Sequence, residues 1–299
     1  DGSSMFGSNN QFGNFPAASL AWRLSNEEFF KSVTWLNDLK LRAGYGVTGN
    51  QSIRDFEYLK RLQASLNNSF YPINGSLSSG VWIANYDNKD VKWEQAQSVN
   101  LGIDFTLFNN KLGGSFDVYN KKTKDLLYVL NLPAQAIGGG QSPFVNLGNM
   151  TNKGFEIALN YHYSSLAPVN PFSLDVGVNL SRNINELTKL ADGVKRTFLL
   201  SNRSVQPSVL QAGLPFGAFY GYKVEGIFKS AEEIAGAATQ PGAHLGGFRY
   251  AHVSGPNGAP DGIINDDDRT YIGNPHPDFI YGFNLNARYY NFDVSLFFN

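Results

Sequence analysis

The chain has 299 residues, carries a net charge of −1 and contains no cysteine. The near-neutral charge provides no basic surface for a nucleic-acid partner, and the lack of cysteine excludes disulfides, thiolate metal sites and cysteine nucleophiles. Charged residues make up 16% of the chain, against roughly 25% in an ordinary soluble domain.

Alternating apolar and polar residues predict eight strands. In GFEIALNYHY, from Gly154 to Tyr163, the apolar side chains share one parity and the polar ones share the other. The apolar face of such a strand packs either in the dry core of a soluble β-sandwich or against lipid. Most of these strands exceed the roughly 5 or 6 residues usual in globular sheets. The strands are expected near residues 15–24, 38–48, 92–107, 112–128, 153–164, 172–185, 277–289 and 292–299.

The connections between these strands alternate between short and long. The short ones are FNNK at 108–111, where the asparagines favour a turn with positive φ, and the segments 165–171 and 289–291. The long ones are 48–91, 129–153 and a region at 186–276. Short turns at one end and long loops at the other favour an outer-membrane barrel over a Greek-key sandwich.

The helical signal is weak and is confined to two segments. In SNEEFFKSVTW, Ser25 with Glu28 three residues later forms the pattern of a capping box. The segment SAEEIAGAA predicts one or two further helical turns. No apolar run approaches the roughly 18 residues that a membrane-spanning helix needs.

Several blocks of sequence, in order, resemble the SusC/RagA class of TonB-dependent outer-membrane transporters of the Bacteroidota. These blocks are LKLRAGYGVTGNQSI (39–53), DVKWEQAQSVNLGIDFTLFNNKLGGSFDVYNKKTKDLL (90–127), NLGNMTNKGFEIAL (146–159), FYGYKVEGIF (219–228) and DGIINDDDRTYIGNPHPDFIYGFNL (261–285). The opening segment, 1–30, is similar as well. The resemblance covers nearly the whole chain, but it does not identify a cargo.

The resemblance implies an all-β fold, a partial antiparallel transmembrane barrel of about eight strands out of roughly 22. Residues 1–299 are then expected to be one segment of the barrel domain, with 186–276 as a long extracellular loop region. Both ends of the chain look cut, so the plug domain, the TonB box and the last strand are expected outside it. The implied partners are a SusD-like surface lipoprotein, the TonB complex and outer-membrane lipid.

The implied function is import of an oligosaccharide or a peptide through a plugged barrel, with no catalysis and no required cofactor. The chain is therefore expected in the outer membrane, as a multi-pass protein. The alternative is a soluble extracellular β-sandwich binding module, which would need no detergent. A secreted β-rich hydrolase is disfavoured because no catalytic constellation is found.

The strand parity assigns side chains to the two faces of the implied barrel. Ile103 shares the apolar parity and is left unassigned. The side chains expected to face lipid are Leu41, Leu159, Leu174, Val176, Leu285 and Val294. The side chains expected to face the lumen, to contact a plug or to form a solvated and mutually paired lining, are Lys40, Arg42, Asp104, Asp117, Glu156, Asp175 and Arg288.

Two loop features suggest ligands. Trp82, Tyr86 and Trp93 are suited to stacking on sugars, although packing within a loop or against a partner is the favoured interpretation. In NGAPDGIINDDD (257–268), the side chains of Asp261, Asn265 and Asp268 fall at positions five, nine and twelve of a calcium loop. A calcium ion could therefore bind there, but position three is an alanine. The alternative is a solvated Asp-Gly turn in which Arg269 balances one carboxylate.

Overall fold

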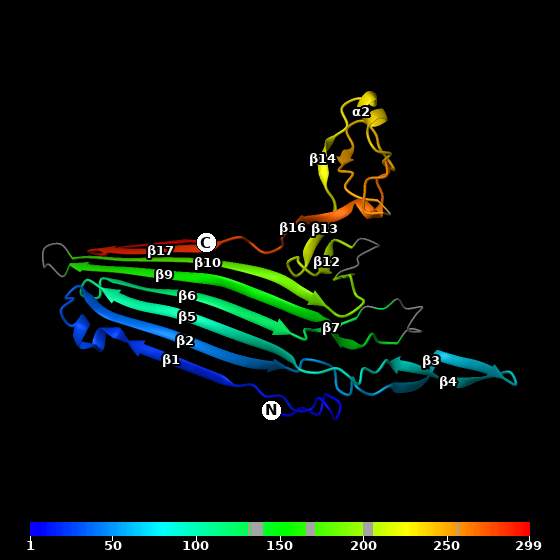
Figure 1. Cartoon of the computed structure of the whole chain (residues 1–299), viewed down its shortest axis with the longest axis horizontal. Helices are drawn as coiled ribbons and strands as arrows, with labels where there is room; N and C mark the ends of the chain where they lie inside the picture. The colour runs from blue at the N-terminus through cyan, green and yellow to red at the C-terminus, as the bar shows by residue number, and fades with distance from the viewer. Residues whose placement is uncertain (131, 133–139, 166–170, 200–205, 256) are drawn as a thin grey trace. The chain divides into compact units, whose positions relative to one another are not determined.

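The computed structural model describes residues 1–130, 132, 140–165, 171–199, 206–255 and 257–299. Its main element is an antiparallel sheet of eight strands in the order β1-β2-β5-β6-β9-β10-β17-β18 (Figure 1). These strands are β1 (Ala17–Arg23), β2 (Leu36–Asn50), β5 (Glu94–Leu107), β6 (Leu112–Lys124), β9 (Gly148–Ser165), β10 (Phe172–Leu190), β17 (Ile280–Tyr289) and β18 (Phe292–Phe298). The sheet is open, and the prediction of an all-β chain built on about eight antiparallel strands is confirmed.

The register of the sheet keeps the two parities apart from strand to strand. Leu41 of β2 lies opposite Ile103 of β5, which lies opposite Phe116 of β6. Leu159 of β9 is likewise paired with Val178 of β10. Because side chains alternate between faces at every residue, this register gives the whole sheet one apolar and one polar face.

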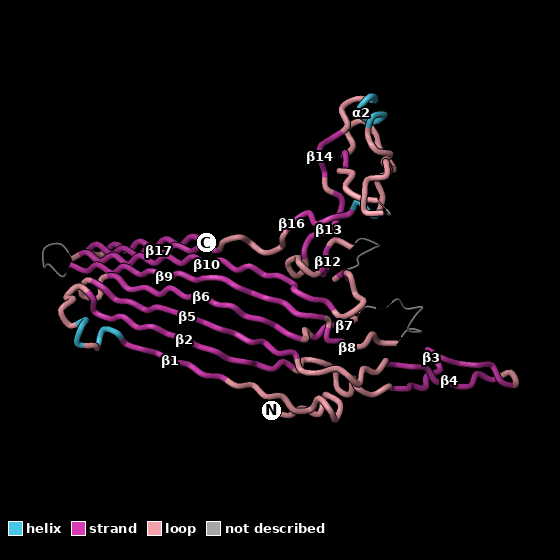
Figure 2. The backbone as a smooth tube through the Cα atoms, in the orientation of Figure 1, coloured by secondary structure: helices cyan, strands magenta, loops and turns pink. Residues whose placement is uncertain are grey.

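The described short connections, at 108–111 and 289–291, lie together at one end of the sheet, called here the turn end (Figure 2). At 108–111, Phe108, Asn109 and Asn110 have φ angles of 57°, 55° and 64°, as expected for an asparagine-rich turn. The predicted helix after Ser25 is wrong, because the segment forms two 3₁₀ turns, η1 (Leu24–Asn26) and η2 (Glu28–Phe30). Ser25 caps neither of them and instead donates its hydroxyl hydrogen to Asp38. Most of the predicted short turn at 165–171 lies outside the described residues.

The opposite end, called here the loop end, contains strands that the sequence reading missed. β3 (Arg61–Ile73) and β4 (Ser76–Asn85) form a hairpin within the predicted loop 48–91. β7 (Leu127–Val129) pairs with β8 (Phe144–Asn146). The predicted strand 112–128 is interrupted because Asp125 adopts a φ of 56°, which ends β6 before β7 begins.

Residues 192–277 form a second compact unit. In it β11 (Arg196–Phe198), β12 (Ser208–Gln211), β13 (Ala218–Tyr222) and β16 (Arg269–Gly273) make one small sheet, and β14 (Val224–Ile227) pairs with β15 (Phe248–Tyr250). The predicted helical turns are confirmed as α2 (Ala231–Gly236), whose N-cap Ser230 accepts a hydrogen bond from the Glu233 amide. A 3₁₀ turn, η3 (Asp266–Asp268), precedes β16. Within the described ranges, no helix is long and apolar enough to cross a membrane.

Candidate functional site: a two-faced sheet

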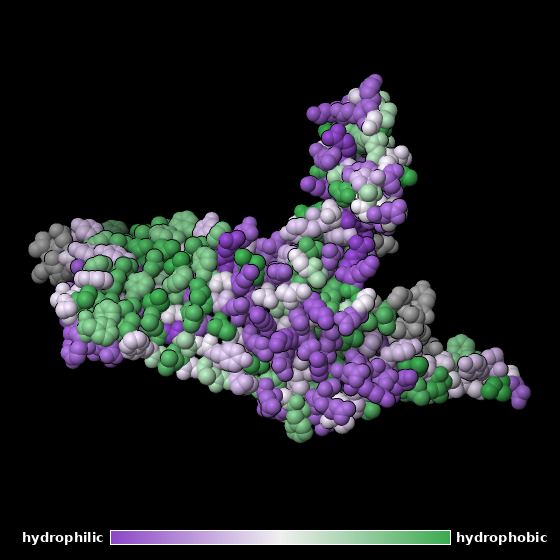
Figure 3. Space-filling model, in the orientation of Figure 1, coloured by the Kyte–Doolittle hydropathy of each residue, from purple (hydrophilic) through white to green (hydrophobic). Residues whose placement is uncertain are grey.

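The apolar face carries a belt of nearly uniform height. On β9 it runs from Phe155 to Tyr163, and on β10 it runs from Phe172 to Leu180, which is nine residues on each strand. A tilted strand needs roughly 9–11 residues to cross a bilayer. Figure 3 shows apolar side chains gathered over the half of the sheet nearer the turn end. The belt therefore has the height of a membrane-spanning surface.

The belt is exposed although it is apolar. Leu101 is 52% exposed and Val294 is 50% exposed. The residues expected to face lipid share this face, since they pair with one another or with other apolar residues of the belt: Leu41, Leu159, Leu174, Val176, Leu285 and Val294. Ile103, which was left unassigned, lies on it too. That the face meets lipid stays a prediction.

The polar face is organised around Arg42. Its Nε and Nη2 atoms each lie 2.8 Å from an oxygen of the Asp104 carboxylate, which is a bidentate pair. The Nη2 atom also lies 2.9 Å from an oxygen of Asp117, on the next strand but one. Lys40 approaches Asp104 to 3.4 Å. Four of the residues expected to face the lumen thus form one ion-pair network across β2, β5 and β6.

Gly102 makes this network possible. It lies between Arg42 and Asp117 in the register. A Cβ atom at this position would meet the Asp117 carboxylate and would lie 2.7 Å from Arg42 Cζ. The absence of a side chain on β5 lets the guanidinium span three strands.

The remaining predicted lumen residues are dispersed along the same face. Asp175 pairs with His162 at 2.5 Å, and Arg288 pairs with Asp293 at 3.2 Å. Glu156 lies opposite Asp117, away from the cations of the network. The partners His162 and Asp293 both occupy the polar parity of their strands, which places His162 on the lumen-facing side as its parity predicts. Most of these charges are paired with one another. This arrangement matches a mutually paired polar lining, which was the alternative to contact with a plug.

A small aromatic core is packed at the loop end of this sheet. Trp93 is buried, and its ring centre lies 5.1 Å from that of Phe6 and 5.2 Å from that of Phe15. Its indole Nε1 donates to the carbonyl of Gln11. Trp93 is therefore a packing residue, as the favoured interpretation predicts. Trp82 is partly buried.

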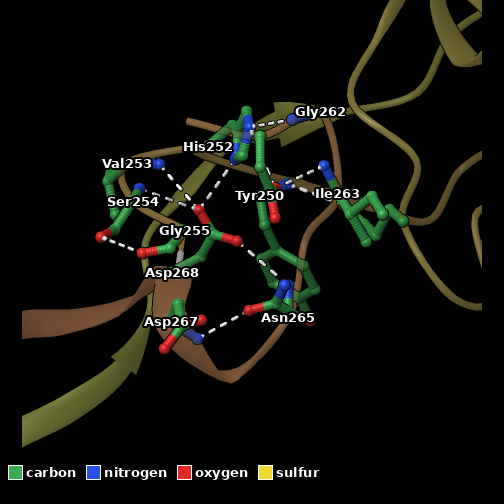
Figure 4. A network of polar contacts seen from close by, with 12 residues as sticks. Tyr250, His252, Val253, Ser254, Gly255, Gly262, Ile263, Asn265, Asp267 and Asp268 are labelled. Carbon is green, nitrogen blue, oxygen red and sulfur yellow. Dashed lines mark hydrogen bonds and ion pairs between the residues drawn. The ribbon is translucent and has the colours of Figure 1, made fainter. Parts of the chain in front are cut away.

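In the unit 192–277, a buried carboxylate organises the segment that was considered a calcium loop (Figure 4). Asp268 is fully buried. Its Oδ1 atom accepts hydrogen bonds from the Val253 and Ser254 amides and lies 2.9 Å from His252 Nδ1, and its Oδ2 atom accepts from the Asn265 amide. Burial alone raises the pKa of this carboxyl, but the bonds from Asn265, His252, Ser254 and Val253 outweigh it and lower the pKa from 3.8 to about 2.

The tautomer of His252 follows from its two contacts. The Gly262 amide donates to Nε2 at 2.7 Å, so Nδ1 carries the proton that is donated to Asp268. His252 was not predicted as a partner, because it precedes Asp268 by 16 positions and lies outside the segment 257–268.

The other predicted calcium ligands also make local hydrogen bonds. Asp261 accepts from the Ile263 amide, and Asn265 accepts from the Asp267 amide. Arg269, expected to balance a carboxylate, instead donates to the carbonyl of Gln206 and stacks over Tyr220. Among the residues described, no cluster of three metal-ligating side chains is found. Calcium binding is not tested by this geometry and stays a prediction.

Comparison with protein families gives a match over the whole chain, residues 1–299, to the model described as TonB dependent receptor-like, beta-barrel. The chain is 37% identical over 304 residues to TonB-dependent receptor P3 of Formosa agariphila, and the alignment covers 100% of this chain and 29% of that protein. It is 30% identical to TonB-dependent receptor SusC of Bacteroides thetaiotaomicron, with 99% of this chain and 28% of SusC covered. The chain thus spans less than a third of the length of these relatives.

The fold is similar to that of a solved transporter. The structure of the RagAB peptide transporter matches with a TM-score of 0.74 and 26% identity, covering 96% of this chain and 28% of that one. The RagAB peptide importer in its 'closed-closed' state matches with a TM-score of 0.75 and 25% identity, covering 99% and 30%.

Proposed function

Given that this chain belongs to the family of TonB-dependent receptor-like β-barrels, we propose that it forms part of the wall of an outer-membrane importer. Its relatives are TonB-dependent receptors rather than enzymes. The cargo in this proposal is a nutrient, either an oligosaccharide or a peptide. A plug elsewhere in the protein would close the barrel, and TonB would open it.

The observation that carries this proposal is the two-faced register of the sheet. In the pairs β2–β5, β6–β9 and β9–β10, an apolar belt with the height of a bilayer and a polar face lie on opposite sides of the sheet. A strand with these two faces is stable when one side meets lipid and the other meets a wet lumen. The alternative of a soluble sandwich needs a second sheet over the belt, yet residues such as Leu101 and Val294 are exposed.

The polar face suits an aqueous path better than a binding site. Arg42 is neutralised by two carboxylates, so its charge is directed into the wall and not at a passing solute. Gly113, Gly177 and Gly282 add no side chains of their own to this face, although the Asn284 and Asn179 side chains lie over Gly177 and Gly282. We infer that such a wall selects weakly by charge, and that selection lies with the loops, the plug and a SusD-like lipoprotein at the loop end.

The cargo class and the sidedness rest on the relatives. RagAB is described as a peptide transporter, and its sequence identity to this chain is 26%. Peptide and oligosaccharide therefore both stay open. In the proposed topology, the segments 48–91, 129–153 and 186–276 are extracellular, and the 108–111 turn is periplasmic.

Uptake by intact cells tests the proposal. Cells lacking the gene for the protein that carries this chain should lose uptake of fluorescent oligosaccharides or peptides, and the gene should restore it. Removal of TonB should abolish the same uptake, and an affinity tag should co-purify a lipoprotein. Unchanged uptake of both cargo classes in the deletion strain, or a protein that is soluble without detergent, would contradict the proposal.

A further inference from the structure

The apolar belt ends in different chemistry at its two edges. At the turn end its edge is aromatic, with Phe172, Tyr289 and Phe292 side by side on β10, β17 and β18. At the loop end the same face turns cationic. The residues that form this loop-end cation cluster are Lys122, Lys124, Lys153 and Arg182. Figure 3 shows the corresponding change from apolar to hydrophilic side chains toward the loop end.

The register places three of these cations in one oblique row, and Lys124 lies two residues beyond Lys122 on β6. Lys153 of β9 lies opposite Asn120 of β6, so Lys122 is its diagonal neighbour. Arg182 of β10 lies opposite Phe155, two residues from Lys153. Diagonal neighbours on one face of a sheet lie roughly 7–8 Å apart. The row is therefore compact enough for one anionic group to contact two or more cations.

The cluster lacks the internal compensation found on the polar face. All four side chains are exposed, and within the described part of the chain the three lysines form no ion pair. Within the same part of the chain Arg182 forms no ion pair either, and its guanidinium lies over the Phe279 ring, 5.1 Å from the ring centre. Glu186, opposite Thr151, is the acidic side chain beside Lys153 on this face. Like charges at these spacings repel one another, and one carboxylate, Glu186, faces four cations, so an anionic partner would relieve the repulsion that remains.

Next to the cluster, the apolar face is hollowed. A cavity of about 360 Å³ is bordered by Leu20, Trp22, Ala43, Leu101, Phe116 and Val118. The small side chain of Ala43, between Leu20 and Leu101 in the register, accounts for the depression. Val118 lies four residues before Lys122 on the same face of β6, a distance of roughly 13 Å along the strand. The hollow and the cluster are thus one surface.

We propose that this surface binds a phosphorylated, acylated lipid of the membrane leaflet at the loop end. The hollow at Ala43 takes an acyl chain, and the loop-end cation cluster takes the phosphate through charge-assisted hydrogen bonds. The inference rests on the proposed function, since it requires the apolar belt to lie in a bilayer. An uncharged lipid could fill the hollow, but only an anionic headgroup matches the cluster.

Native mass spectrometry of the full-length detergent-purified protein tests whether the loop-end cation cluster binds the lipid headgroup. The probes are phosphatidylglycerol and phosphatidylcholine with identical palmitoyl and oleoyl chains. The wild type should retain phosphatidylglycerol preferentially. Each lysine replaced by glutamine should weaken that retention about fivefold, so the combined Lys122→Gln, Lys124→Gln and Lys153→Gln variant should lose about 100-fold. Raising the salt concentration should weaken wild-type binding as well.

The matched control for the headgroup is Lys121→Gln. It makes the same charge change on the same strand but on the polar face, and it should leave phosphatidylglycerol retention unchanged. The binding of an acyl chain in the hollow is tested by Ala43→Leu. This substitution fills the hollow and should weaken retention of phosphatidylglycerol about fourfold for each methylene displaced. Ala287→Leu, on the same face away from the hollow, should have no effect.

The outcomes separate this inference from the proposed function. Equal retention of the two lipids by the wild type, or equal loss in Lys121→Gln and the triple variant, would overturn the lipid site. Cell fractionation is run in parallel. A wild-type protein found in the outer membrane without a phosphatidylglycerol preference would refute only this inference, whereas a wild-type protein absent from the membrane would refute both proposals.

Discussion

The unit 192–277 buries apolar residues in a core, whereas the eight-stranded sheet exposes apolar residues along one face. The small unit buries Val209, Ala218 and Tyr220 in a core of its own. The sheet, which has far longer strands, leaves residues such as Leu101 exposed along one whole face. A protein in water does not normally present a continuous apolar surface of this size.

The difference shows where each region obtains its stability. The unit 192–277 has what an aqueous environment requires, namely a small core and a buried carboxylate with all its hydrogen bonds made. Under the proposed function, the sheet is stabilised by lipid against its belt. Changes that distinguish core from belt therefore test this comparison, and the following ones are ordered by expected effect.

The largest effect is expected at the middle of the belt. Leu159→Arg should destabilise the membrane-inserted protein by about 2–4 kcal/mol, since it places a charge at the bilayer midplane. The neighbouring Asn160→Arg puts the same side chain on the polar face and should cost far less. Urea unfolding in lipid vesicles measures both. Equal losses from the two variants would show that the two faces do not differ in environment.

A smaller and local effect is expected at Asp268. Asp268→Asn leaves amide donors such as those of Val253 and Ser254 facing an NH₂ group or a weaker acceptor, and should destabilise the unit by about 1–3 kcal/mol. Hydrogen exchange should report faster exchange at these amides, while β9 and β10 stay protected. Asp267→Asn, at an exposed position on the same turn, is the control. Faster exchange throughout the sheet would show that the two regions do not unfold separately.

Acidification should reproduce part of this loss. The folded-state pKa of Asp268 is lowered from 3.8 to about 2, so its contribution is fully present above about pH 4 and is lost as the pH falls toward 2. Hydrogen-exchange protection of the unit 192–277 should fall over that window. Asp268→Asn should remove this pH dependence, and an identical acid transition in the variant would rule out Asp268 as its source.

The smallest effect is expected at the polar face. Gly102→Ala should displace Arg42 from Asp117 and cost about 0.5–1 kcal/mol, because partly solvated ion pairs contribute little. Gly44→Ala is the matched control, since a Cβ atom there would meet nothing within 4 Å. Thermal unfolding in detergent compares the two variants. A larger loss at Gly44 would remove the proposed reason for the glycine at 102.

The long strands could be predicted because their pattern is strictly local. Alternation over nine or more residues located β2 and β5 to within two positions at each end, and the same parity separated Lys40 and Arg42 from Leu41. The ion pairs among these side chains could not be predicted, since they depend on a register between strands that lie far apart in sequence. Gly102 became interpretable only once Arg42 and Asp117 were placed on either side of it.

The short strands in the loop regions were not predicted, for a different reason. The strands of the unit 192–277 are too short to show a period, so their pairing depends on tertiary contacts. The hairpin of β3 and β4 did carry a signal, the Asn74-Gly75 pair with φ angles of 49° and 78°, which is typical of a tight hairpin turn. The sequence of the acidic loop suggested calcium ligands because it shows the carboxylates but not their partner. The partner of Asp268 is His252, which lies outside the motif.

The central claim, that the apolar face of the sheet meets lipid and the polar face meets water, is tested most directly by site-directed fluorescence quenching. The chain has no cysteine, so single cysteines at Leu159, Leu174 and Leu285 and at their polar neighbours Asn160, Asp175 and Asn286 can each be labelled in vesicles. A lipid-phase quencher should quench the first three positions strongly and the last three weakly. Equal quenching on both parities would contradict the claim.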